Sequence, residues 1–205
     1  MGTLPQVETA PGQAADIKQK VQEVLGDAPE AMKVALENAL RDMSEKPEQA
    51  SRMVSAGRAG SRVGTVSEFT IIAPLREGGA AQLRGILKLL NGNFSGADKV
   101  GTLHDMRFLI LDNDTKLLFA TAYDGDWDAY IDDFATKIPD LMDLMFFDIE
   151  GWPGISHPSV RDFFAKYQLT ADGWYVANPN LTVVEARRLQ RVGTALDEFL
   201  DKISE

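Results

Sequence analysis

Three polar residues in the middle of the chain could carry out chemistry together: His104, Asp124 and Arg107. A neutral imidazole accepts protons and binds metals at about pH 7, so His104 is a candidate general base and a candidate metal ligand. Asp124 is the candidate catalytic acid, because it follows a predicted strand and has no evident local role. Arg107 is the candidate anion clamp. The alternative for His104 is a structural histidine bonded to a neighbouring carbonyl.

These residues belong to a predicted β-hairpin, residues 103–123, whose strands are joined by the turn Asp112-Asn113-Asp114-Thr115. Alternation along the first strand places His104 and Phe108 on one face and Arg107 on the other. We therefore expect His104 and Arg107 to serve different sides of the sheet. Both faces of the hairpin are largely apolar, which predicts a cover on both. Helices of this chain would form one cover, and a second sheet, a partner subunit or a ligand the other.

Composition changes along the chain predict three parts. Residues 1–15 are rich in Pro, Gly, Ala and Gln, which indicates a disordered N-terminus. Residues 16–62 show helical periodicity followed by a Gly- and Arg-containing linker, and we interpret them as a helical extension. Residues 63–205 carry the mixture of strands and helices that is typical of an α+β domain.

The order of elements in the α+β domain is strand, helix, strand, strand, helices, strand, helix, with the last strand predicted at residues 174–178. This is the order of a ferredoxin-like antiparallel sheet. Two such sheets can pack face to face to cover their second faces. The expected fold is therefore a dimeric α+β barrel with an N-terminal helical extension and an apolar cavity for a small molecule.

Charge and composition exclude several classes of function. The 31 acidic and 21 basic residues give a net charge of -10, which repels phosphate backbones and argues against nucleic-acid binding. The chain contains no cysteine, so disulfides, thiolate metal sites and thiol nucleophiles are excluded. No apolar run reaches membrane-spanning length and no secretory signal is recognisable, so we expect a cytoplasmic protein that does not bind membranes.

Two motifs, Tyr123-Asp124-Gly125-Asp126-Trp127 and Tyr130-Ile131-Asp132-Asp133-Phe134, stand between LHDMRFLILD and WYVANPNLTVVEARR. With these flanking stretches the chain resembles a family of uncharacterised bacterial proteins over about residues 66–203. That family shares the dimeric α+β barrel superfamily with dye-decolourising peroxidases, chlorite dismutases and antibiotic-biosynthesis monooxygenases.

The resemblance implies a small-molecule oxidoreductase, peroxidase- or monooxygenase-like, with or without haem. Haem-binding relatives use a proximal histidine, which implies His104 as the metal ligand here. Phe108, Tyr123 and Trp127 would then contact the cofactor, and the alternative is that they belong to the core. Dye-decolourising peroxidases add an arginine and a distal aspartate in a Gly-x-x-Asp-Gly motif. This chain has Asp124-Gly125 without the motif's glycine.

Two other classes of function stay open from the residues alone. The first is a non-catalytic binder that holds a hydrophobic small molecule in the same cavity. The second is a protein-interaction module that docks through its N-terminal helices. All three interpretations are compatible with a homodimer.

Overall fold

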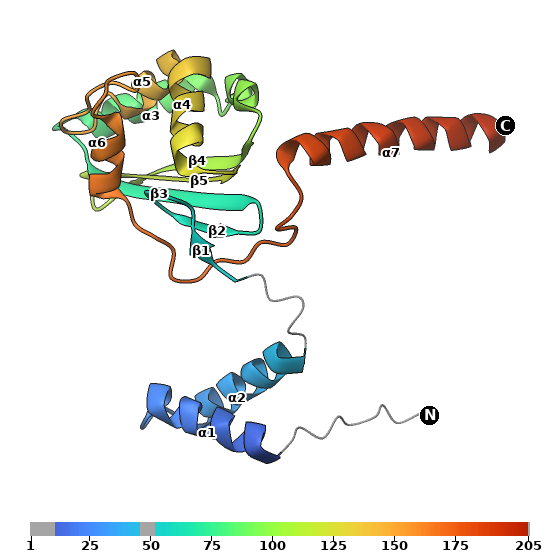
Figure 1. Ribbon diagram of the computed structural model, residues 1–205. Helices are drawn as coiled ribbons and strands as arrows, with labels where there is room; N and C mark the ends of the chain where they lie inside the picture. The colour runs from blue at the N-terminus through green and yellow to red at the C-terminus, as the bar shows by residue number, and fades with distance from the viewer. Residues whose placement is uncertain (1–10, 46–51, 205) are drawn as a thin grey trace. The chain divides into compact units, whose positions relative to one another are not determined.

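The computed structural model describes residues 11–45 and 52–204 of the chain (Figure 1). The chain divides into two compact units, one ending at Ser51 and the other beginning at Arg52. The end of the stretch that the sequence assigns to the helical extension and its linker, residues 16–62, instead contributes β1 (Val54–Ser55) and most of β2 (Ser61–Val63) to the second unit. None of the described helices is both long enough and apolar enough to span a membrane.

The first unit contains two helices, α1 (Pro11–Leu25) and α2 (Glu30–Glu45). Ile17 and Val21 lie one turn apart on α1 and are buried. Helix α1 ends before Gly26, whose positive φ of 48° suits the residue that follows a helix. Helix α1 thus begins at Pro11, inside the stretch predicted to be disordered, and residues 1–10 of that stretch lie outside the described residues.

The second unit is built on one antiparallel sheet with the strand order β1-β2-β3-β5-β4. Its strands are β1 (Val54–Ser55), β2 (Ser61–Val63), β3 (Val66–Pro74), β4 (Leu103–Leu111) and β5 (Lys116–Asp124). Strands β4 and β5 form the predicted hairpin, with left-handed backbone at Asp112, Asn113 and Asp114 in the turn. The α+β class with an antiparallel sheet is thus confirmed.

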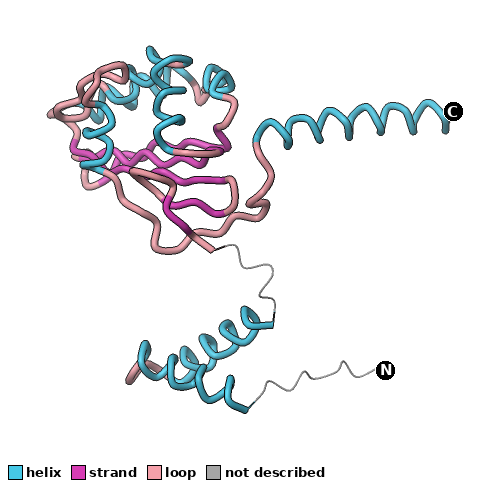
Figure 2. Tube along the Cα trace, viewed as in Figure 1, coloured by secondary structure: helices cyan, strands magenta, loops and turns pink. Residues whose placement is uncertain are grey.

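Helices cover one face of this sheet, as Figures 1 and 2 show. They are α3 (Gly79–Leu90), the 3-10 helix η2 (Ser95–Val100), α4 (Trp127–Lys137), α5 (Pro139–Phe146) and α6 (Val160–Tyr167). The core between sheet and helices is dominated by fully buried aromatic residues: Phe69, Phe119, Trp127, Phe134, Phe146 and Phe164. Neighbouring rings pack edge to face, for example Phe119 on Phe146 at 5.1 Å between centroids. This aromatic core holds the helices against one face of the sheet.

The strand predicted at residues 174–178 does not form, and this part of the prediction is wrong. Strand β2 occupies that edge, pairing Arg62 with Ser67 and Val63 with Val66. A two-residue turn at Gly64 and Thr65 brings β2 onto β3 at a much smaller entropic cost than a distant segment would require. The order of β3, α3, β4 and β5 remains compatible with a ferredoxin-like arrangement.

The face of the sheet that carries no helix is here called the open face. A coil, residues 168–182, crosses one end of it and is here called the covering segment. Its backbone is held by β3: Leu169 N–H donates to the Thr70 carbonyl at 2.9 Å, and Ala171 N–H to the buried Glu68 carboxylate at 3.3 Å. At the other end of the open face Leu109 stays 46% exposed. The described residues of the second unit therefore cover the open face at one end only.

Gly60 offers a test of how tightly β2 is held. Its φ is 79°, and an added Cβ would overlap the carbonyl oxygen of Glu68. We expect Gly60→Ala to lower the free energy of unfolding by about 2 kcal/mol or more. Gly85 lies in the middle of α3 with open space around it. Gly85→Ala should therefore raise the free energy of unfolding by up to about 1 kcal/mol. Urea denaturation measures both, and a shift of the same sign in the two variants would contradict the packing described.

Candidate functional site

The end of β5 and the start of β4 bring His104 and Asp124 together. His104 Nε2 lies 2.7 Å from Asp124 Oδ1. The other carboxylate oxygen of Asp124 accepts a hydrogen bond of 2.8 Å from the backbone N–H of Val183. Val183 is the first residue of the C-terminal helix α7 (Val183–Ser204). Asp124 thus joins both strands of the hairpin to the beginning of α7.

A β-bulge in β4 decides which way His104 points. Leu103 pairs with Tyr123 and Asp105 pairs with Ala122, so β4 has one extra residue, His104, between these pairs. A bulge breaks the regular alternation of side chains, and His104 lies beside Asp105 and Ala122 in a groove on the open face. The expectation that His104 and Arg107 lie on opposite faces is therefore wrong. Arg107 pairs with Ala120 and also belongs to the open face.

The groove lies between the open face and the covering segment and has a volume of about 390 Å³. Its lining is mostly apolar, with polar groups at His104, Asp105 and Asn178. The complete lining is Val66, His104, Asp105, Ala122, Trp174, Tyr175, Val176, Ala177, Asn178, Leu181 and Ala186. A concave surface with few polar groups among apolar side chains is typical of a small-molecule site.

The hydrogen bond to Asp124 fixes the tautomer of His104. An ionised carboxylate only accepts hydrogen bonds, so the proton of the neutral imidazole lies on Nε2. The lone pair is then on Nδ1, which makes no hydrogen bond among the described residues. The side chain of His104 is 27% exposed, which leaves the ring accessible to a ligand. His104 is therefore arranged as a proton acceptor whose partner, Asp124, stabilises its charged form.

Arg107 lies beside the groove and does not line it. Its Nε is 3.2 Å from Oδ1 of Asp105, and its side chain is 65% exposed. Asp105, which does line the groove, stands between Arg107 and His104 along β4. A ligand that extends past Asp105 would therefore meet the guanidinium.

The predicted cofactor residues Phe108, Tyr123 and Trp127 lie on the helical side of the sheet. Phe108 packs against Phe119 with 5.0 Å between ring centroids. Tyr123 and Trp127 are fully buried. The sheet separates these three side chains from His104, so the four residues do not form one pocket that fits a haem. Within residues 11–45 and 52–204, no cluster of three His, Cys, Asp or Glu side chains could hold a metal ion.

Two further polar residues, Asp126 and His157, have ordinary structural roles. Asp126 occupies the N-cap position of α4, but its carboxylate binds Arg62 at 2.8 Å and makes no capping hydrogen bond. His157 Nδ1 lies 2.8 Å from the hydroxyl of Ser159 in the loop before α6. Neither residue lines the groove.

Sequence analysis missed the contribution of the covering segment to the groove. Residues 174–178 alternate like a strand, but Gly173 precedes them and Pro179 follows Asn178, and such residues often mark a loop. The sequence Thr182-Val183-Val184-Glu185 has the form of a capping box, and in the structure Thr182 N–H donates a 3.0 Å hydrogen bond to the Glu185 carboxylate. Only tertiary structure, however, places this helix start next to Asp124.

Comparison with protein-family models, with curated proteins and with solved structures finds no match to this chain. The resemblance to the α+β barrel superfamily therefore depends on the motifs themselves.

The two aspartates that flank Gly125 make a matched pair for mutation. Asp124→Ala leaves the Val183 N–H and the His104 ring without their partner, so we expect a loss of about 2 kcal/mol or more in unfolding free energy. Asp126→Ala removes one exposed ion pair, and should change the free energy of unfolding by no more than about 0.5 kcal/mol. Urea denaturation of both variants checks this, and equal effects would contradict the bridging role of Asp124.

The stacked phenols of Tyr123 and Tyr130, 3.8 Å apart, predict how stability depends on pH. Burial raises the pKa of both above the ordinary tyrosine value, and the charge of Glu68 raises that of Tyr123 further. Above about pH 10 the unfolded chain releases phenolic protons that the folded chain retains, so the free energy of unfolding falls as pH rises. Between about pH 9 and 11 this fall should be smaller in Tyr123→Phe/Tyr130→Phe. Denaturation at several pH values measures it, and parallel curves for both proteins would contradict the prediction.

Proposed function

We propose that this protein is a small-molecule oxidoreductase of the cofactor-free monooxygenase kind, with His104 as its general base. The observation that carries the proposal is the His104–Asp124 pair, at 2.7 Å, in the wall of a mostly apolar groove. A base held by a carboxylate next to apolar surface is suited to removing a proton from a weakly acidic apolar ligand. The proposal takes its reaction class from the resemblance to the α+β barrel superfamily.

The proposed reaction begins when a ligand lies against Ala122 and Trp174 with an acidic C–H or O–H group directed at His104. The proton moves to Nδ1 of His104, and Asp124 stabilises the resulting imidazolium. The carbanion left in the groove reduces molecular oxygen, which enters as the second substrate, and a C–O bond forms between them. The proton held on His104 passes to the outer oxygen, which gives a hydroperoxide and restores the neutral base. Loss of water from this hydroperoxide, with cleavage of the O–O bond and removal of the second C–H proton, leaves a carbonyl group, so that a methylene group and O2 become a carbonyl group and water. The apolar lining favours this step because it keeps water away from the reactive anion.

Arg107 fits the proposal as the group that binds negative charge on the ligand. Its guanidinium is engaged by Asp105 at 3.2 Å, so an anionic ligand would have to exchange for that carboxylate. We propose that Arg107 acts on ligands that carry an acidic substituent. Arg107→Ala should then raise KM for acidic ligands and leave KM for neutral ligands unchanged.

The dimeric α+β barrel is part of the proposal. Its support is the uncovered end of the open face, where Leu109 is exposed and Ile72 and Leu118 are half-buried. A second sheet packed there would remove this apolar surface from water. Haem binding, with His104 as the metal ligand, stays a prediction of the sequence that the absorption spectrum of the purified protein tests.

The experiment uses the full chain with anthrone, a flat apolar molecule with an acidic methylene group. Binding is followed by quenching of tryptophan fluorescence, because Trp174 lines the groove, and oxidation by oxygen uptake. We expect His104→Ala to bind anthrone but to lower the rate of oxygen uptake by about a hundredfold or more. His157→Ala, which alters the other histidine, serves as the control and should match the wild-type rate.

Three results would overturn parts of this proposal. Equal rates in His104→Ala and the wild type would exclude His104 as the base. Quenching without oxygen uptake would favour a non-catalytic binder. A Soret absorption band that disappears in His104→Ala would show that haem binds and would replace the cofactor-free mechanism.

A further inference from the structure

The covering segment, residues 168–182, is fastened to the rest of the second unit on both sides of the groove. On one side, Leu169 N–H donates to the Thr70 carbonyl of β3 at 2.9 Å. On the other side, the Pro179 carbonyl accepts a hydrogen bond of 2.7 Å from the N–H of Thr65 and one of 3.1 Å from the Thr65 hydroxyl. Both sides of the segment therefore have fixed points.

The buried carboxylate of Glu68 adds a fixed point on the first side. One of its oxygens accepts from Ala171 N–H at 3.3 Å and from the N–H of Ser61 in β2 at 2.9 Å. The other oxygen accepts from the Thr70 hydroxyl at 3.2 Å. Glu68 is only 5% exposed, so losing one of these donors would leave a buried charge less well satisfied. Ala171 is thus held where the covering segment reaches the groove.

Residues 172–178, between these fixed points, are held much less firmly. Among the residues that the structure describes, none donates a hydrogen bond to this stretch from the sheet or accepts one from it. None of residues 172–178 is buried: Trp174 and Val176 are half-buried, and Tyr175 between them is 86% exposed. Few hydrogen bonds and little buried apolar surface are the conditions under which a segment opens locally.

This stretch is also longer than the distance that it has to span. Glu68 and Thr65, which bind its two ends, are three positions apart in the chain, or about 10 Å along a strand. The eight residue steps from Ala171 to Pro179 could extend over about 27 Å. Residues 172–178 can therefore move away from the sheet while both ends keep their hydrogen bonds.

The same stretch forms one side of the groove. Residues 174–178 line the groove from the covering segment, and Val66, His104, Asp105 and Ala122 line it from the sheet. Movement of residues 172–178 would therefore widen or close the groove. A ligand that contacts both sides would favour the closed position, because only there does it gain both sets of contacts.

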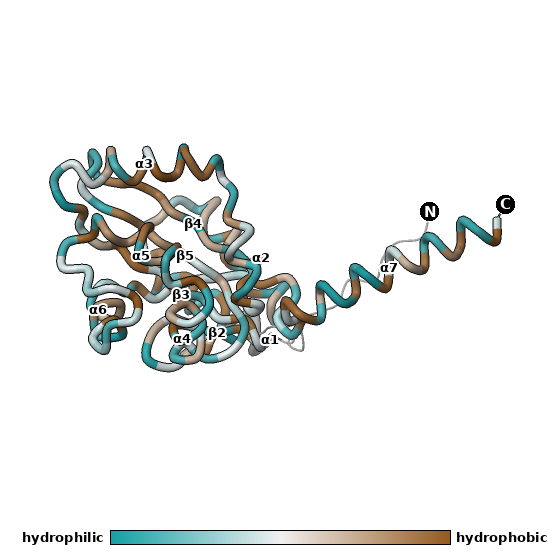
Figure 3. The backbone as a smooth tube through the Cα atoms, turned by 90° about the horizontal axis from the view of Figure 1, so that it is seen from above, coloured by the Kyte–Doolittle hydropathy of each residue, from teal (hydrophilic) through white to brown (hydrophobic). Residues whose placement is uncertain are grey.

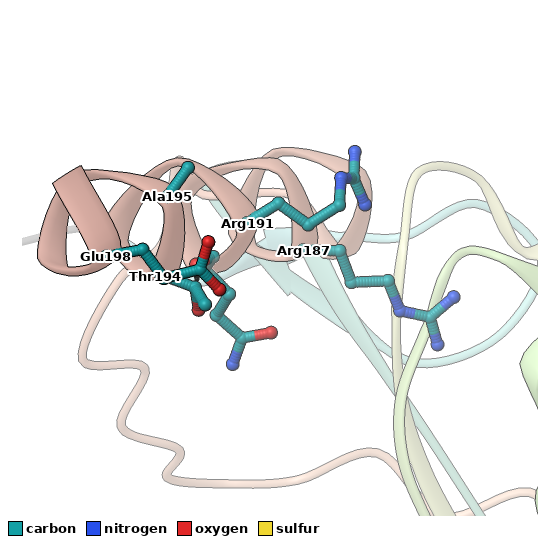
Figure 4. Close-up of a pocket in the computed structure, with 6 residues that line it drawn as sticks. Arg187, Arg191, Thr194, Ala195 and Glu198 are labelled. Carbon is teal, nitrogen blue, oxygen red and sulfur yellow. Dashed lines mark hydrogen bonds between the residues drawn. The ribbon is translucent and has the colours of Figure 1, made fainter. Parts of the chain in front are cut away.

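A second hollow, along helix α7, is built differently. Its lining, which includes Arg187, Arg191 and Glu198, comes from that helix alone (Figure 4). Brown and teal alternate along α7 in Figure 3, which is the hydropathy pattern of a helix with a polar and an apolar side. This hollow is a space between neighbouring polar side chains of one helix. The groove, in contrast, lies between two segments that can separate.

We propose that residues 172–178 form a lid that opens to admit a ligand to the groove and closes when the ligand is bound. The fixed points at Ala171 and Pro179 are its hinges. Closure brings Trp174 onto the ligand and restricts the access of water to His104, which protects the carbanion of the proposed reaction. The inference deepens the proposed function by naming what controls access to the same groove, and it rests on that function for the identity of the ligand.

Shortening the lid tests, without any ligand, whether it covers His104. In the full chain, Gly-Ser-Gly in place of residues 172–178 can still span about 13 Å, so the urea midpoint of the second unit should not change. Diethyl pyrocarbonate modifies neutral imidazole and should reach Nδ1 of His104 about threefold faster or more in the shortened protein. His157, the other histidine of the chain, lies outside the groove and serves as the internal control. Mass spectrometry measures both rates, and an unchanged rate at His104 would overturn the proposal.

Amide hydrogen exchange of the unaltered chain tests whether the lid moves, and it does not depend on how the shortened protein folds. The N–H groups of residues 172–178 should exchange about a hundredfold faster or more than those of Leu169 and Val183, which are hydrogen-bonded. With anthrone bound, as tryptophan quenching reports, exchange in the lid should slow about tenfold or more. Exchange in α3, away from the groove, serves as the control and should stay the same.

The outcomes separate the lid from the proposed reaction. Exchange of residues 172–178 as slow as that of Leu169 in the free protein would show a fixed cover and overturn the proposal. Bound anthrone that leaves the exchange of the lid unchanged would also overturn it. Bound anthrone that slows exchange in the lid without oxygen uptake would support the lid and contradict the proposed reaction. If anthrone fails to bind, fast exchange in the free protein together with faster modification of His104 in the shortened protein would still support the lid.

Discussion

The carboxylate of Asp124 is the interaction on which the candidate site depends. One oxygen binds the ring of His104 on the bulge of β4, and the other binds the first N–H of α7. A largely buried carboxylate is stable only when its oxygens are paired, so the end of β5, the bulge and the start of α7 must form together. That arrangement determines the tautomer of His104. It also fixes the C-terminal end of the covering segment and the start of α7.

The two faces of the sheet are packed in different ways. On its helical side, aromatic residues fill the space between strands and helices, and residues such as Tyr123 and Trp127 have a structural role there. Among the described residues of the second unit, the covering segment is what lies over the open face, and the buried Glu68 helps to hold it through the N–H group of Ala171. A coil packs less densely on a sheet than a row of helices does, and the groove beside His104 lies beneath it. The site is thus on the side of the sheet where packing is incomplete.

The two apolar surfaces that the second unit leaves exposed have different forms. The uncovered end of the open face is a small patch around Leu109, while helix α7 carries a longer row of exposed apolar side chains between Leu189 and Ile203. Regular spacing specifies a partner more narrowly than apolar area alone, because only a helix of matching spacing fits the row.

Local sequence patterns determined most of the elements of this protein. Alternation gave β4 and β5, the Asp- and Asn-rich turn joined them, and helical spacing identified α3, α4, α6 and α7, because each of these signals depends on neighbours within a few residues. Tertiary structure alone decided the rest. A bulge turns His104 to the open face, β2 takes the edge that residues 174–178 were expected to fill, and Asp124 meets Val183, which lies 59 positions further along the chain. Each of these outcomes depends on hydrogen bonds between different segments of the chain. The periodicity of one segment alone does not predict which segment it will bond to.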